Sequence, residues 1–77
     1  MLSFEYAAPA AGEMPEELQI VCDREGLSSL LNQLQFLTDA RTEHVHLMRE
    51  SWGGNHLSEK PFNPSATPIR HVKILLR

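Results

Sequence analysis

The chain has few of the residues that mark disulfide-rich, membrane-spanning or nucleic-acid-binding proteins. Its 77 residues include one cysteine, Cys22, which has no partner for an internal disulfide, so we expect a protein of the reducing cytoplasm. No apolar run approaches the ~18–20 residues of a transmembrane helix. The N-terminus lacks the basic start of a signal peptide, and Glu5 and Glu13 interrupt its apolar residues. A formal net charge of −3 argues against nucleic acid. We therefore expect neither a membrane nor nucleic acid among the partners.

What is present is ordinary for a small globular protein, with 42% hydrophobic and 22% charged residues. Residues 1–77 are expected to form a single domain with a small core, and because small domains often gain stability by associating, a homodimer is a reasonable expectation. The charges are unevenly placed, because no acid follows Glu59 whereas four bases do: Lys60, Arg70, Lys73 and Arg77. Either neighbouring strands pair opposite charges, or a basic strip at the last strand meets an acidic partner.

Alternation of apolar and polar residues predicts four strands, at residues 1–6, 18–22, 43–49 and 69–77. The residues predicted to lie on the face under the helix are Leu2, Phe4, Tyr6, Leu18, Ile20, Cys22, Val45, Leu47, Val72, Ile74 and Leu76. Residues 50–68 are predicted to form a long irregular loop. Loops of that length in small domains are often functional.

The stretch from Arg24 to about Thr38 predicts the single helix. Asp23 is placed to cap it, and Glu25 lies near the positive end of its dipole. Five leucines recur at helical spacing and are expected to supply most of the folding energy: Leu27, Leu30, Leu31, Leu34 and Leu37. The predicted fold is therefore α+β, with the order ββαββ and one helix packed on one face of a mostly antiparallel four-stranded sheet.

The second face of that sheet is left uncovered and must meet water or a partner. The residues predicted on it are Gln19, Val21, His44, His46, Met48, His71, Lys73 and Leu75. Directly after the third strand come Trp52, Gly53 and Gly54. The glycine pair is typical of a tight turn with positive φ angles. Trp52 either caps the edge of a small core or anchors a partner.

Patterns that would indicate catalysis or metal binding are weak. His44 and His46 share a strand face, as metal ligands do, with His56 or His71 as a third ligand and a carboxylate as a fourth. Ordinary surface or interface histidines explain the pattern better, because a half-wet strand face tolerates them. Ser51 lacks the glycine two residues earlier that a nucleophile elbow needs. Cys22 is predicted to face the helix as a structural thiol. We therefore expect no catalytic residue, no metal site and no cofactor.

Four segments together resemble a known family. They are Gly26-Leu27-x-x-Leu30, His44-Val45-His46-Leu47-Met48, Ser51-Trp52-Gly53-Gly54-x-x-Leu57 and His71-Val72-Lys73-Ile74. They are similar to the small bacterial immunity proteins of polymorphic toxin systems classed as immunity protein family thirty-two, over residues 18–76. The resemblance implies an immunity-like core over residues 18–77, preceded by an N-terminal strand and loop over 1–17. It also implies direct binding of a toxin and no catalytic residues.

The sequence therefore favours a non-enzymatic protein that binds and neutralises a cognate toxin. The residues expected to contact the partner are His44, His46, Met48, Trp52, Gly53, Gly54, Leu57 and His71. Two alternatives stay open. One is a homodimeric interaction domain without a toxin partner, and the other is a His-based metal-binding module.

Overall fold

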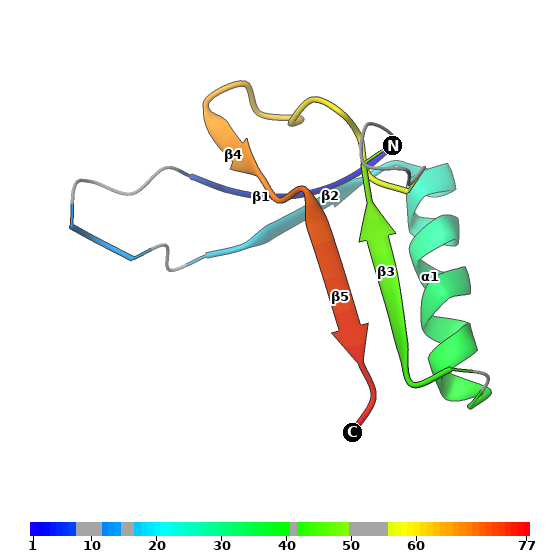
Figure 1. The fold of residues 1–77 in the computed structure, drawn as a ribbon. Helices are drawn as coiled ribbons and strands as arrows, with labels where there is room; N and C mark the ends of the chain where they lie inside the picture. The colour runs from blue at the N-terminus through cyan, green and yellow to red at the C-terminus, as the bar shows by residue number, and fades with distance from the viewer. Residues whose placement is uncertain (8–11, 15–16, 41, 50–55) are drawn as a thin grey trace.

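Two small antiparallel sheets and one helix form the chain in the computed structural model (Figure 1). The structure describes residues 1–7, 12–14, 17–40, 42–49 and 56–77. In chain order the elements are β1 (Leu2–Ala7), β2 (Gln19–Cys22), α1 (Arg24–Thr38), β3 (His44–Met48), β4 (Ala66–Pro68) and β5 (His71–Leu75). The predicted α+β class is confirmed.

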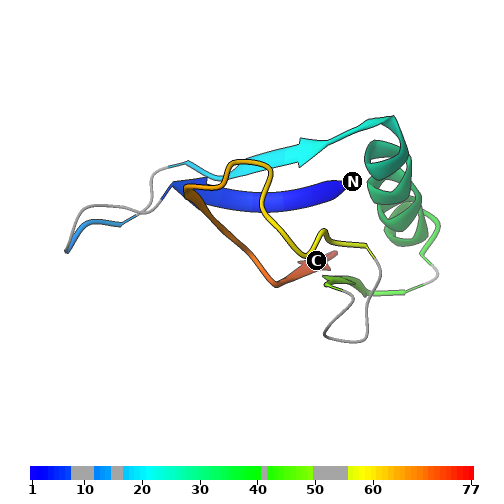
Figure 2. The same cartoon turned by 90° about the horizontal axis from the view of Figure 1, so that it is seen from above.

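The prediction of one four-stranded sheet is wrong, because the strands divide into two sheets. One has the order β2-β1-β4 and the other pairs β3 with β5. β1 pairs with β2 through its first four residues and with β4 through its last three, so Glu5 takes part in both pairings. From the sequence, β4 is predicted to lie in a loop, because its three residues lie among prolines and show no alternating pattern. They form a strand in the structure because they pair with the last three residues of β1. The two sheets run across each other, with α1 behind β3 (Figures 1 and 2).

The hydrophobic core lies where β1, β3 and the chain after residue 56 meet. Leu2, Phe4, Leu47 and Leu57 form its buried centre, each at most 5% exposed. Half-buried side chains from β2, α1, β5 and the residue after β4 pack around them: Cys22, Leu30, Ile69, Val72 and Ile74. Burying each such aliphatic or aromatic side chain contributes on the order of 1.5–3 kcal/mol. The inward placement predicted for Leu2, Phe4 and Leu47 is confirmed.

Helix α1 has the predicted bounds and the predicted cap. Asp23 Oδ1 accepts a hydrogen bond from the Gly26 backbone N–H at 2.8 Å. Its buried side differs from the predicted stripe, because Leu27 and Leu31 are 45% and 56% exposed whereas Gly26 and Leu37 are buried. A Cβ atom on Gly26 would overlap the carbonyl group of Met1. The helix therefore lies so close to the start of β1 that only glycine fits at this position. This contact sets the rotation of the helix and turns Leu27 and Leu31 outward.

Strand β2 also departs from its predicted packing. Leu18 and Ile20, expected under the helix, are 54% and 51% exposed. Within the described residues β2 is an edge strand that pairs with β1 alone, and α1 begins just after its end at Cys22. The helix therefore covers only that end, where Cys22 packs against the core as predicted.

A buried carboxylate joins β1 to the segment before β4. Glu5 has no exposed surface, and it accepts hydrogen bonds from the Ser3 hydroxyl at 2.6 Å and from the backbone N–H groups of Phe62 and Asn63 at 2.9 and 3.0 Å. Burial alone would raise the pKa of Glu5, but the three hydrogen bonds outweigh burial and lower it. Glu5 thus remains a carboxylate inside the protein and holds residues 62 and 63 against β1.

Candidate functional site

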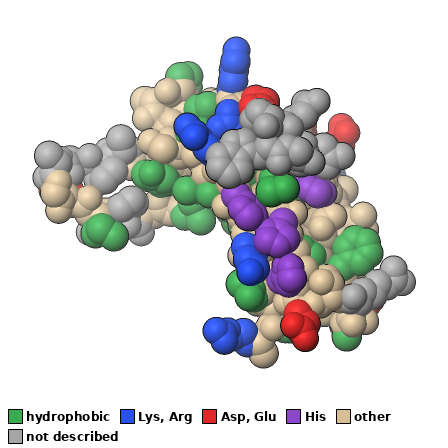
Figure 3. Space-filling model, in the orientation of Figure 1, with side chains coloured by type: hydrophobic (Ala, Val, Ile, Leu, Met, Phe, Trp, Pro, Cys, Tyr) green, Lys and Arg blue, Asp and Glu red, His purple; other side chains and the backbone are tan. Residues whose placement is uncertain are grey.

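The outward side of β3 and β5 brings three of the four histidines together. The two strands are antiparallel, with His46 opposite Lys73 and Met48 opposite His71. Val45 and Leu47 point into the core, so the residues that alternate with them point out. We call the outward set the histidine face: His44, His46, Met48, His71, Lys73 and Leu75. Figure 3 shows the histidines in a row over these strands, with basic side chains beside them.

The rings of His44, His46 and His71 contact one another in sequence along this face. His46 Nδ1 and His71 Nε2 lie 2.7 Å apart, within hydrogen-bond distance. The ring centroids of that pair are 4.9 Å apart, and His44 packs edge-on against His46 at the same centroid distance. A hydrogen bond between two imidazoles needs one nitrogen with a proton and one without, so at least one ring of the pair is neutral when they are bonded.

The surroundings of His46 oppose its protonation. Partial withdrawal of the ring from water lowers its pKa first, and the positive charges of His44, His71 and Lys73 lower it further. His46 therefore resists protonation while the bases around it are charged and no counter-charge is present.

The geometry gives the metal-binding alternative no support. Within the described part of the chain, no group of three histidine, cysteine or acidic side chains is placed to hold a metal ion. The 2.7 Å between His46 and His71 is a hydrogen-bond distance.

The segment that carries the Trp-Gly-Gly motif begins and ends beside this face. Trp52, Gly53 and Gly54 themselves lie outside the described residues. The flanking residues are held together, because His56 and Leu57 both donate their backbone N–H groups to the carbonyl of Met48, at 3.3 and 3.2 Å. Residues 49 to 57 therefore leave and rejoin the fold next to the histidine face.

Two further contacts fasten the two ends of this segment. Arg49 and Leu57 form a parallel β-bridge. The Arg49 guanidinium donates to the backbone carbonyl and the carboxylate of Glu59, at 2.6 and 3.0 Å. The expectation that Leu57 contacts a partner needs correction, since its side chain is only 5% exposed and belongs to the core. Leu57 thus positions the segment and does not present a contact surface.

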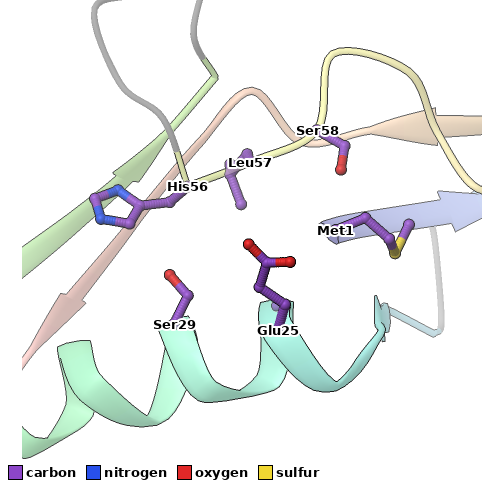
Figure 4. A pocket seen from close by; sticks show the side chains of 7 residues that line it. Met1, Glu25, Ser29, His56, Leu57 and Ser58 are labelled. Carbon is purple, nitrogen blue, oxygen red and sulfur yellow. The ribbon is translucent and has the colours of Figure 1, made fainter.

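A small cavity of about 240 Å³ lies at the first turn of α1 (Figure 4). It is lined by Met1, Glu25, Gly26, Ser29, His56, Leu57 and Ser58. Ser29, His56 and Glu25 have the side-chain types of a nucleophile, a base and an orienting acid, respectively. The imidazole of His56 points away from the carboxylate of Glu25 in Figure 4, and none of the hydrogen bonds found between described residues joins the three. A nucleophilic site needs such linked side chains, so we assign this cavity no chemistry.

Sequence reasoning placed His44, His46 and Met48 on one strand face, and His71 and Lys73 on another, but not next to one another. Only the register of β3 and β5 shows that they form a single surface. Gln19 and Val21, predicted on the same face, belong to the other sheet. Neither the pair of Arg49 with Glu59 nor the buried Glu5 has a local signal, because each depends on residues distant in sequence.

Comparison with known proteins identifies one family. The family model described as Immunity protein 32 matches residues 17–69, which is more than half of the chain. The matched range includes α1, β3 and β4 and the segment with the Trp-Gly-Gly motif, and it ends before β5. No curated protein and no solved structure matches the chain. Among the described residues, α1 is too short and too polar to cross a membrane.

Proposed function

The chain belongs to the family Immunity protein 32, and from this premise we propose that it neutralises a cognate bacterial toxin by binding it directly. The family match is the observation that carries the proposal. The cavity at the first turn of α1 is consistent with it, because its volume of about 240 Å³ is smaller than typical ligand sites and it holds no linked catalytic side chains. We therefore propose a non-enzymatic inhibitor, acting in the cytoplasm as part of a polymorphic toxin system.

The histidine face is the surface that we propose for toxin binding. α1 and the core lie on the inner side of β3, and the described residues place nothing over the outer side (Figures 2 and 3). The face combines hydrogen-bonding rings with apolar area at its ends, where Met48 is half-buried and Leu75 is 54% exposed. Such a mixture is typical of protein interfaces. We include Trp52, Gly53 and Gly54 in the proposed surface because their segment is anchored beside Met48.

The test is co-expression with the toxin encoded by the adjacent gene. Growth of cells that carry both proteins, and co-purification of the pair, are the expected results. His46→Ala and Trp52→Ala should weaken protection while circular dichroism shows a folded protein. Asn32→Ala, at an exposed position of α1, is the matched control and should protect like the parent.

Two outcomes would contradict different parts of the proposal. If the unaltered protein neither restores growth nor co-purifies with the toxin, the toxin-neutralising function is wrong. If it does both, and the His46 and Trp52 variants protect as well as the Asn32 variant, the function stands and the proposed surface is wrong.

A homodimer is a second candidate, and the exposed edge of β2 favours it. Residues 18–22 contain no charged residue, and Leu18 and Ile20 are each more than half exposed beside the free backbone of an edge strand. Edge strands with these properties tend to pair with another chain. We propose that two copies pair through β2, on the opposite part of the fold from the histidine face. Sedimentation at micromolar concentration separates this dimer from a monomer.

A further inference from the structure

All the charge on the histidine face is basic. His44, His46, His71 and Lys73 are four of its six outward residues, and the other two are apolar. Figure 3 shows basic side chains next to the row of histidines. The face therefore has no carboxylate of its own to balance its bases.

Among the described residues, which do not include Glu50, the groups that flank the face do not supply that balance either. Arg70 precedes β5 and Arg77 ends the chain, and both are exposed. Glu43 lies just before β3, next to a single histidine, and Glu59 is engaged by Arg49 at 3.0 Å. α1 packs on the inner side of β3, so its acidic residue Glu25 does not reach the outer side.

This arrangement makes positive charge on the face depend on what lies against it. Histidine is the side chain whose ordinary pKa, near 6.5, lies between about pH 6 and about pH 8, so its charge responds to its surroundings in this range. At His46, partial withdrawal of the ring from water lowers the pKa first, and repulsion by the neighbouring rings and Lys73 lowers it further. Carboxylates placed over the face would remove that repulsion and favour protonated rings. They would also accept hydrogen bonds from both nitrogens that the His46–His71 pair now shares.

We infer that the histidine face docks onto an acidic patch of the toxin and that complex formation takes up protons on the histidines. The inference rests on the proposed function and specifies the chemistry of the partner's surface. The complex consequently tightens as the pH falls from about 8 to about 6, since each proton taken up changes the dissociation constant by up to about tenfold per pH unit. Lys73 supplies the permanent charge of the face and the histidines supply the adjustable part.

A protein carboxylate surface fits this face better than nucleic acid does. Binding to a phosphate backbone relies on several permanently charged Lys and Arg side chains. The face has one, Lys73, and the chain as a whole has a net charge of −3. Met48 and Leu75 also add apolar area at the edges of the face, which suits a protein surface.

The experiment measures the dissociation constant of the purified protein and its adjacent-gene toxin at about pH 8 and about pH 6, each with and without EDTA. We expect the unaltered protein to bind at least about tenfold more tightly at the lower pH. His46→Gln should flatten this dependence. Lys73→Glu should weaken binding at least about tenfold, because like charges then face each other. Lys60→Glu makes the same change in net charge at an exposed position off the face, and it should change binding by no more than about twofold.

Specific results would overturn the inference. If the toxin binds equally well at both pH values, or if Lys73→Glu and Lys60→Glu weaken binding alike, the acidic-patch docking is wrong and the proposed function still stands. If His46→Gln keeps the full pH dependence, the protons go to other groups and the inference is again wrong. If EDTA abolishes binding, a metal ion bridges the two proteins, and the inference of direct contact between histidines and carboxylates is wrong. Absence of toxin binding at every pH removes both the inference and the proposed function.

Discussion

Removing the Glu5 carboxylate should destabilise the protein far more than removing any exposed acid. The side chain is fully buried and accepts three hydrogen bonds, two of them from the backbone N–H groups of Phe62 and Asn63. Glu5→Ala leaves both N–H groups without their carboxylate partner in a part-buried site. Each buried unsatisfied group costs roughly 1–3 kcal/mol. Part of this cost is offset because the variant no longer has to bury a charge. We expect a net loss of about 3 kcal/mol.

That loss is large for a chain of this size. A domain of 77 residues has a free energy of unfolding of roughly 4–12 kcal/mol. A loss of about 3 kcal/mol should lower its melting temperature by roughly 12–24 °C. Glu5→Gln keeps one side-chain oxygen as an acceptor, so only one of the two N–H groups loses its partner. We expect that variant to lose about 1–3 kcal/mol.

The pH dependence has a defined sign. In the unfolded chain the Glu5 carboxyl titrates near its ordinary pKa of 4.5, and in the folded protein the pKa lies lower. The contribution of Glu5 is therefore complete above that pH and is lost as the pH falls through the lowered folded-state pKa. The pKa of Asp23 is also lowered, by the N-terminal ammonium first and by the Gly26 N–H next, so the protein as a whole loses more stability in acid than Glu5 accounts for.

Urea unfolding followed by circular dichroism, at neutral pH and at several values below 4.5, measures both effects. The gap in stability between the unaltered protein and Glu5→Gln should shrink as the pH falls. Glu13→Gln makes the same chemical change at an exposed position and should leave the free energy of unfolding within about 0.5 kcal/mol. Equal stability of the Glu5 and Glu13 variants at neutral pH would refute the buried-carboxylate reasoning.

Two further predictions concern the helix and the free strand edge. Gly26→Ala should destabilise the protein by about 1–3 kcal/mol in thermal unfolding, although alanine is the better helix former, because its methyl group meets the Met1 carbonyl. Ser28→Ala, at an exposed position of the same helix, is the control and should be neutral or stabilising. Equal effects of the two substitutions would contradict the close contact. Ile20→Lys should convert the proposed dimer to a monomer in sedimentation without loss of fold, since Ile20 is 51% exposed; dimers that persist would rule out pairing through β2.

The parts of the fold that follow local rules were predictable. Asp23 before leucines at helical spacing predicts where α1 begins, and the structure has the same start and cap. Alternation within β3 predicts that Val45 and Leu47 point in and that His44 and His46 point out, as observed. The rule fails for Leu27 and Leu31, because the rotation of a helix about its axis depends on what it packs against, here the Met1 carbonyl beside Gly26.

Only part of the candidate site was predictable, because only part of it depends on the pattern within one strand. An alternating pattern tells which side chains share a face of their own strand, but it does not tell which strand pairs with which, or in what register. His46 and His71 are 25 residues apart in the chain, and only the pairing of β3 with β5 brings their ring nitrogens within 2.7 Å. Glu5 shows the opposite error, since a glutamate in an alternating strand reads as a solvent-facing residue and here meets two backbone N–H groups more than fifty residues away.

The amino-acid sequence by itself determined the helix, the inward and outward sides of β3 and β5, the α+β class and the membership of an immunity protein family. These depend on short-range spacing and on residue identity, which a linear chain carries in full. Tertiary structure alone decided the division into two sheets, the addition of β4, the burial of Glu5 and the union of three histidines with Lys73. Each of these depends on which distant segments pair, and pairing is settled by packing of the whole chain.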